Sequence, residues 1–150
     1  MKSYLKPIYW ALITITLLSS CAQEDEPTPT GELKVLVRNS NGAGDNTAMS
    51  ILWVWPIEET GWHVESALEL LNSDWARDTR NVPYPSAHRI ERFTGVFQLQ
   101  LEPGQYLVAT MLTEAPQGRY SYTTVAVEAG QQTTVTKVFT GVEDYSYENW

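Results

Sequence analysis

The stretch that decides the fold is Gly95-Val-Phe-Gln-Leu-Gln-Leu-Glu-Pro-Gly-Gln-Tyr-Leu-Val-Ala109. Its first half alternates apolar and polar residues, which is typical of a β-strand with one buried face. Pro103 has no backbone N–H to donate and Gly104 can adopt a positive φ, so the chain is expected to reverse there. Tyr106 then lies in a second strand, Gln105–Leu112. We expect the two strands to pair as a hairpin.

Similar patterns extend outward in both directions from this stretch. Further strands are predicted over Glu32–Arg38, Ala48–Ile57, Ser121–Glu128 and Gln131–Phe139, the last two as a second hairpin. The segment Ala48–Ile57 is apolar on both faces, so either both faces are covered or one is a binding surface. Short strands separated by regularly spaced turns favour a sandwich. We therefore predict an all-β fold, a seven-stranded Greek-key sandwich.

Residues 58–92 interrupt the β pattern. Between Val64 and Trp75, apolar side chains recur at i, i+3, i+4, i+7 and i+11, which predicts a short amphipathic helix. The segment Asn81–Pro85 cannot continue a helix, because proline removes a helical hydrogen bond and restricts the residue before it. Residues 58–92 are therefore predicted to be a helical insertion in the sandwich domain, residues 31–140.

Two segments resemble a known domain family. Gly31-Glu-Leu-Lys-Val-Leu-Val-Arg38, the Gly/Asn/Asp-rich turn after it and Ala48 resemble the start of a carboxypeptidase regulatory-like domain, which has a transthyretin-like (prealbumin-like) fold. The Gly-aromatic-Pro-Gly-x-Tyr pattern of Gly95–Ala109 and the segment Val125–Val135 resemble later parts of it. The resemblance covers about 31–57 and 93–140 and implies an accessory or stabilising module without catalytic residues of its own. The insertion 58–92 has no counterpart in it.

The amino terminus has the pattern of a bacterial lipoprotein signal. Lys2 and Lys6 precede a mainly apolar run, Ile8–Leu18, which is shorter than the roughly 20 residues that span a bilayer. Leu18-Ser19-Ser20-Cys21 resembles a lipobox, so residues 1–20 are predicted to be cleaved and Cys21 to carry the lipid, palmitate included. The alternative is an ordinary secretory signal followed by a chance cysteine. If Cys21 is lipidated, the anchor is expected to be permanent, because two or more acyl chains hold a protein stably at a membrane.

Residues 21–30 are predicted to be a flexible tether. Gln23-Glu24-Asp25-Glu26 resembles the acidic stretch that directs many Bacteroidetes lipoproteins to the cell surface, although a plain solvated linker has the same composition. Pro27-Thr28-Pro29-Thr30 favours an extended spacer. Ala22 after the cysteine does not argue against the outer membrane. We therefore expect a lipid-anchored outer-membrane protein that is exposed at the cell surface.

Charge and cysteine content exclude several classes of function. The chain carries a formal charge of −8, and −10 once the signal with its two lysines is removed. Nucleic acid is not an expected partner, since its recognition needs a basic surface. The single cysteine leaves no intramolecular disulfide and no cysteine-based zinc site. No cofactor is predicted.

No catalytic constellation stands out. The two histidines, His63 and His88, both fall in the insertion near carboxylates, so a His₂-carboxylate metal site is one hypothesis. Their spacing matches no ligand pattern, however, and surface histidines are favoured; no metal site is predicted. The sequence contains no Gly-x-Ser-x-Gly elbow and no phosphate-binding glycine loop. We predict that the protein is not an enzyme.

Aromatic residues are the main binding candidates. Trp53 and Trp55 share one face of a strand, and Trp62, Trp75 and Tyr84 come from the insertion. One interpretation is that the insertion folds over the sheet and these rings form a satellite core. The other is an exposed aromatic platform that stacks on sugar rings or contacts a surface protein.

The segment 141–150 is an acidic and aromatic tail, which either docks on the sheet or offers a strand to a partner. The main functional hypothesis is a non-enzymatic, membrane-anchored accessory or binding module. The alternatives are a carbohydrate-binding lipoprotein of a glycan-uptake system and a structural component of a surface assembly.

Overall fold

The structure, a computed structural model, describes residues 29–40, 48–114 and 118–150. The predicted signal 1–20, Cys21 and nearly all of the tether 21–30 lie outside the described residues, so lipidation stays a prediction. No helix within the described ranges is long and apolar enough to cross a membrane.

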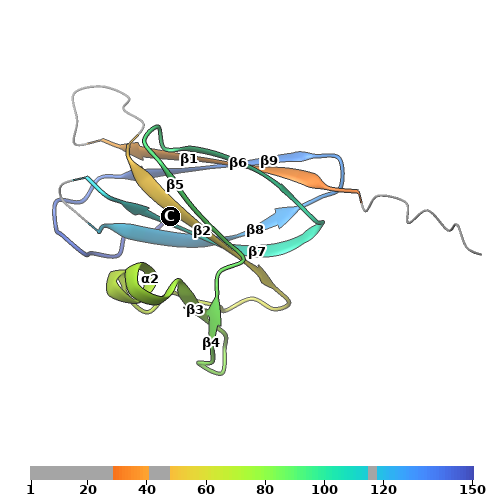
Figure 1. The fold of residues 1–150 in the computed structure, drawn as a ribbon, viewed down its shortest axis with the longest axis horizontal. Coiled ribbons are helices and arrows are strands. Elements are labelled where there is room, and N and C mark those ends of the chain that lie inside the picture. Colours follow the sequence, from red (N-terminus) through yellow and green to blue (C-terminus); the bar gives the residue numbers. More distant parts are fainter. Residues whose placement is uncertain (1–28, 41–47, 115–117) are drawn as a thin grey trace, which may run out of the picture.

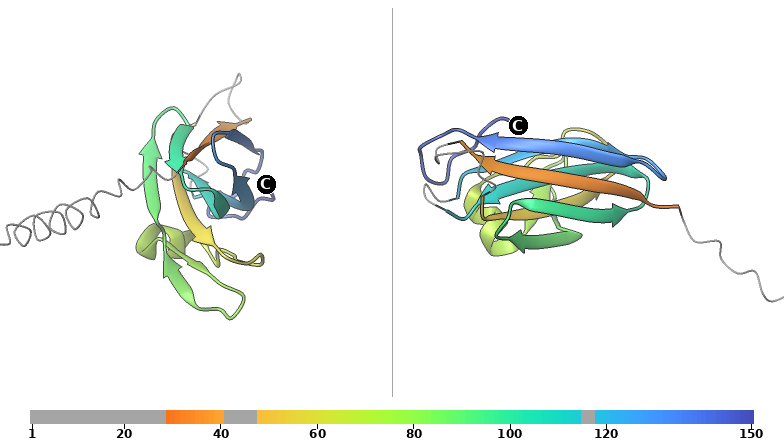
Figure 2. Two further views of the ribbon diagram at one scale, coloured as in Figure 1. Left: turned by 90° about the vertical axis from the view of Figure 1, so that its right-hand side faces the viewer. Right: turned by 90° about the horizontal axis from the view of Figure 1, so that it is seen from above.

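Two β-sheets pack face to face (Figures 1 and 2). One has the strand order β6-β1-β9 and the other the order β5-β2-β7-β8. A β-sandwich is therefore confirmed, and its two sheets hold seven strands in the described chain, although one of them, β5, lies in the insertion. The sandwich strands are β1 (Gly31–Asn39), β2 (Ser50–Ile57), β5 (His88–Arg92), β6 (Val96–Leu101), β7 (Gly104–Leu112), β8 (Tyr120–Val127) and β9 (Gln132–Phe139).

The two predicted hairpins are wrong, because each turn carries the chain from one sheet to the other. β6 pairs with β1, whereas β7 pairs with β2 and β8. β8 belongs to the four-stranded sheet, and β9 pairs in parallel with β1 in the three-stranded sheet. The alternation of apolar and polar residues in these strands is compatible with a hairpin and with a crossing between sheets, since a strand of a sandwich has one inward face in both cases.

The sheets enclose the main core. Leu33, Val35 and Val37 of β1 are fully buried, as are Leu52 and Val54 of β2. The inward residues of the other strands complete it, with Phe97 and Phe139 the largest of them. Burying these side chains is worth about 1.5–3 kcal/mol for each Val, Leu or Phe.

The insertion forms a short helix and a small two-stranded sheet. The helix α2 (Ala67–Ser73) begins at the N-cap Ser66, whose hydroxyl accepts a hydrogen bond from the Glu69 N–H, and ends at Asp74 in the left-handed conformation (φ 57°). It is shorter than predicted, because Trp75 belongs to β3 (Trp75–Arg77), which pairs with β4 (Pro83–Pro85).

This insertion covers the outer face of the four-stranded sheet (Figure 1). Ile51, Trp53, Trp55 and Ile57 of β2 point away from the main core and form a second core. Its other members include Val64, Ala67, Leu70 and Ala76 of the insertion and Leu107, Ala109 and Met111 of β7. β2 is thus covered on both faces, as the first of the two sequence interpretations expects.

The tail docks on the domain. Tyr147 forms a parallel β-bridge with Tyr120, in which the Tyr120 N–H donates to the Ser146 carbonyl and the Glu148 N–H donates to the Tyr120 carbonyl, both at 2.9 Å. The Tyr147 ring also lies 5.5 Å and 5.1 Å, between centroids, from those of Tyr120 and Tyr122. Trp150 packs against the main core.

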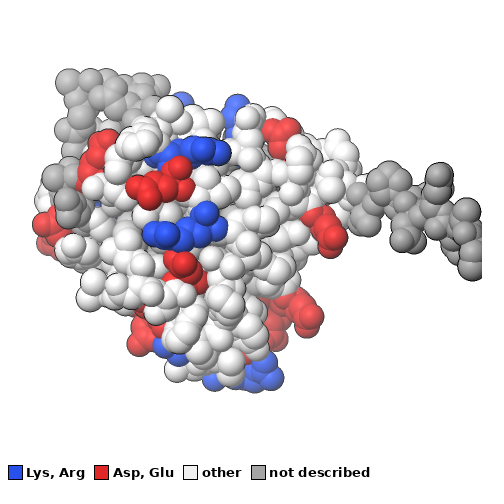
Figure 3. All heavy atoms as spheres, viewed as in Figure 1, with Lys and Arg blue, Asp and Glu red and all other residues white. Residues whose placement is uncertain are grey.

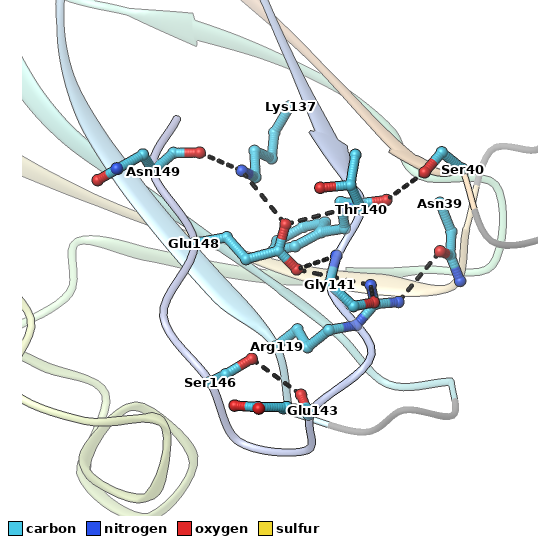
Figure 4. A network of polar contacts seen from close by, with 11 residues as sticks. Asn39, Ser40, Arg119, Lys137, Thr140, Gly141, Glu143, Ser146, Glu148 and Asn149 are labelled. Atoms are coloured by element: carbon cyan, nitrogen blue, oxygen red, sulfur yellow. Dashed lines mark hydrogen bonds and ion pairs between the residues drawn. The ribbon is translucent and has the colours of Figure 1, made fainter.

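Glu148 holds this tail through two buried cations (Figure 4). Its carboxylate lies 3.5 Å from Nη1 of Arg119 and 3.9 Å from Nζ of Lys137, and it accepts backbone N–H bonds from Thr140 and Gly141. Arg119 is fully buried and also donates to the Gly141 carbonyl and to Asn39 Oδ1. Burial lowers the pKa of Lys137, and the neighbouring Glu148 partly restores it.

We predict that Glu148→Ala lowers the free energy of unfolding by about 3–5 kcal/mol, because it removes the carboxylate that faces a buried guanidinium and a buried ammonium. Urea denaturation followed by tryptophan fluorescence measures the change. Glu143→Ala is the matched control, since no interaction of the Glu143 carboxylate is found in the described chain, and it should stay within about 0.5 kcal/mol of the unsubstituted protein. Equal stability of the two variants would contradict a role of the Glu148 carboxylate in docking the tail.

Candidate functional site

Trp53 and Trp55 lie inside the second core and not on the surface. Their exposed fractions are 0% and 1%. The indole N–H of Trp53 donates to Asp74 Oδ1 at 2.7 Å, and that of Trp55 donates to the Tyr84 carbonyl at 3.1 Å. The hypothesis of an exposed platform on these two rings is therefore corrected: both are structural and tie the insertion to β2.

The strands β3 and β4, with the turn between them, form a projecting finger, residues 75–85 (Figure 1). Asp78, only 2% exposed, organises the turn by accepting hydrogen bonds from the backbone N–H groups of Arg80 and Val82, both at 2.9 Å. The chain turns through Asn81, which has a φ of 66°. Asn tolerates this left-handed conformation better than most residues do.

Asp78 also fixes the side chain of Arg80. Arg80 Nε and Nη2 donate to Asp78 Oδ2 at 3.0 and 2.8 Å. Burial alone would raise the pKa of Asp78, but the hydrogen bonds from Val82 and Arg80 outweigh it and the pKa is lowered. The same pair raises the pKa of Arg80. The guanidinium, which is largely exposed, is thereby held beside Tyr84, whose hydroxyl it contacts at 3.4 Å.

A cleft of about 670 Å³ lies between the finger and the end of β2. Its size falls within the range of roughly 300–1,000 Å³ that is usual for small-molecule sites. Its lining combines aromatic and charged side chains: Pro56, Glu58, Glu59, Trp62, Asp78, Thr79, Arg80 and Tyr84. Acidic and basic atoms both surround the finger in the space-filling view (Figure 3).

The two sides of the cleft are linked to each other. The rings of Trp62 and Tyr84 pack with centroids 4.9 Å apart and planes inclined by 34°. The Thr79 hydroxyl donates to Glu59 Oε1 at 2.7 Å. Ring contacts and a hydrogen bond therefore hold the loop after β2 against the finger, so the side chains that make these contacts are positioned before any ligand arrives.

The remaining predicted residues lie elsewhere. Trp75 is 38% exposed on β3 and does not line the cleft. His63 forms a β-bridge with Arg77 through its backbone, and His88 lies on the edge strand β5. In the described residues, no three His, Cys, Asp or Glu side chains gather in a way that could hold a metal ion.

Sequence reasoning identified Trp62 and Tyr84 but missed the polar partners that make a cleft with them. The sequence pattern assigned no role to Glu58, Glu59 or Arg80. A signal was present in Asp78-Thr79-Arg80-Asn81, because Asp and Asn at these positions favour a tight turn between two short strands. The proximity of that turn to the end of β2 depends on tertiary packing.

Comparison with known proteins identifies no family. No protein-family model matches the chain, and no curated protein matches it. Among solved structures, the chain is similar to GBS52, the minor pilin of the Gram-positive pathogen Streptococcus agalactiae, with a TM-score of 0.46 and 19% sequence identity. The similarity covers 73% of this chain and 44% of that one, so the chain spans less than half of the pilin's length.

We predict that Trp53→Ala lowers the free energy of unfolding by about 3–5 kcal/mol, because it empties a fully buried site and removes one hydrogen-bond donor to Asp74. Chemical denaturation measures the loss. Trp75→Ala removes a side chain of the same type from a partly exposed position and should cost less than half as much. Similar losses for the two variants would show that Trp53 is not part of a packed core.

Proposed function

We propose that this protein is a non-enzymatic, membrane-anchored surface module that binds a saccharide in the cleft between the finger and the end of β2. The observation that carries the proposal is the Trp62–Tyr84 ring pair at the border of a cleft whose other walls offer hydrogen-bonding groups. Sugars present apolar C–H faces and a rim of hydroxyls. Aromatic rings can pack against the C–H faces, and carboxylate, hydroxyl and guanidinium groups can form hydrogen bonds with the hydroxyls.

The polar groups of the cleft support this proposal by their rigidity. Asp78 is buried and fully engaged, and it holds Arg80 in place. A ligand would therefore not have to order the Arg80 side chain, which otherwise costs about 0.5–1.5 kcal/mol for an immobilised side chain. Binding at this site needs no contribution from Trp53 and Trp55, which are buried.

The cellular setting of the proposal comes from the sequence. Cys21 with its lipobox-like context supports a lipid anchor in the outer membrane, and the acidic stretch after it supports exposure at the cell surface. The alternating segments and the Pro103-Gly104 turn support a transthyretin-like Greek-key sandwich of the carboxypeptidase regulatory-like type. A fold by itself specifies no activity, so the proposal assigns the function to the cleft that the insertion forms.

The saccharide-binding proposal predicts signals on a glycan array for the chain from Ala22 to Trp150. Trp62→Ala should weaken binding to the positive glycans at least about tenfold, equivalent to roughly 1.4 kcal/mol, because stacking is lost. Isothermal titration calorimetry with the strongest hit measures the change.

Trp75→Ala serves as the matched control, since it removes a tryptophan that lies in the insertion but outside the cleft. It should bind like the unsubstituted chain. An array without any signal, or equal losses for both tryptophan variants, would count against the cleft as a saccharide site.

A second candidate function, a structural component of a surface assembly, is favoured by the docked tail. The bridge between Tyr147 and Tyr120 places the tail in parallel beside β8, through one isolated pair of residues. The acceptor site consists of this strand edge together with the buried cations Arg119 and Lys137. The same site in another copy would accept the tail equally well, because strand addition relies on backbone hydrogen bonds.

The assembly candidate predicts that a chain ending at Val142 binds a synthetic peptide of residues 143–150. Thermal melting should shift upward as the peptide is titrated, since a ligand stabilises the state that it binds. A peptide with Glu148→Gln should bind about tenfold more weakly, because it loses a charge-assisted contact. A truncated chain that is as stable as the full chain and does not respond to the peptide would contradict this candidate.

A further inference from the structure

We propose that the cleft selects saccharides with a free, positively charged amino group over neutral and anionic ones. This inference rests on the proposed saccharide-binding function and specifies its ligand class. It follows from how the charges that line the cleft are paired, and from the chemistry of the rings beside them.

Acidic groups outnumber basic ones in the cleft. Its lining contains three carboxylates, those of Glu58, Glu59 and Asp78, and a single cation, Arg80. The Arg80 guanidinium is engaged by Asp78, which accepts from both Nε and Nη2. That ion pair is internally balanced, so Glu58 and Glu59 give the cleft its net charge.

Neither of these two glutamates has a cationic partner in the described chain. Glu59 accepts a hydrogen bond from the neutral Thr79 hydroxyl through one carboxylate oxygen. Glu58 is exposed, and no hydrogen bond or ion pair of its carboxylate is found among the described residues. A ligand that brings an ammonium group would supply the missing counter-charge, whereas an acidic sugar would be repelled.

The aromatic pair points to the same ligand class. The faces of Trp and Tyr rings attract cations as well as the C–H faces of sugars. Trp62 and Tyr84 lie in contact at the border of the cleft that Glu58 and Glu59 also line. The electrostatic field of the whole protein also attracts a cationic ligand, because the chain after residue 20 carries a formal charge of −10. An amino sugar combines the two properties that these groups recognise.

The test compares the tetramer of glucosamine with the tetramer of N-acetylglucosamine, which has the same length and linkage but no positive charge. With the chain from Ala22 to Trp150, calorimetry at a mildly acidic pH that keeps the ligand amine protonated should show about tenfold tighter binding of the free amine. The preference should disappear at a pH at which the ligand amine is neutral, and it should weaken as salt is added.

Glu58→Gln should reduce this preference to less than about threefold, because it removes one of the two carboxylates that would face the ligand ammonium. Glu102→Gln is the matched control: it makes the same change of charge at an exposed position outside the cleft and should keep the preference.

The outcomes separate this inference from the function on which it rests. Equal affinity for the two tetramers would overturn the selection of amines and leave saccharide binding intact. The same holds if neither tetramer binds but other sugars on the array do. Tetralysine binding as tightly as the glucosamine tetramer would also overturn it, because charge alone would then decide. An array with no bound sugar at all would remove both proposals.

Discussion

The rest of the structure depends on the burial of β2 on both of its faces. Leu52 and Val54 face the main core, and Trp53 and Trp55 face the opposite way. Large rings on the outer face of a sheet would expose several hundred Å² of apolar surface, which a monomer rarely leaves open. The insertion 58–92 provides the cover. Its helix and finger are therefore part of the folding unit and not an appended loop.

The same constraint positions the cleft. The indole N–H groups of Trp53 and Trp55 bond to Asp74 and to the Tyr84 carbonyl, so the two rings fix the base of the finger as well as fill the second core. The finger then extends beyond the sheet, with its turn organised by Asp78. As a consequence, the Tyr84 ring packs against the Trp62 ring. A cleft with defined walls results at the border of a well-packed region, where binding residues are commonly found.

Sequence patterns predicted the strands far better than their pairing. Alternation of apolar and polar residues located the ends of β1, β6, β8 and β9 to within about one residue, because one buried face is enough to produce it. It could not assign these strands to sheets, since the turns at Pro103-Gly104 and Ala129-Gly130 fit a hairpin and a crossing between sheets equally well. Trp75 matched the helical spacing by coincidence, and β5 went unnoticed because Arg89, Glu91 and Arg92 make it polar on both faces. For the site, Trp62 and Tyr84 were found from composition, but their association with Glu58, Asp78 and Arg80 arises only when the insertion folds over β2.

Anchoring and the shape of the cleft fit together in the proposed function. The cleft carboxylates Glu58 and Glu59 are exposed, so each attraction to the proposed ligand would be screened and a single site would bind weakly. In the proposed function, copies anchored in one membrane would share a polymeric ligand, because after the first contact each further one is intramolecular and occurs at a high effective concentration. A long glycan would then be retained by many weak sites without a deep pocket in any of them. A lipid at Cys21 and an extended Pro-Thr spacer would supply that arrangement. Many copies of the domain on one surface would then retain the glycan, although each domain alone would have a low affinity for it.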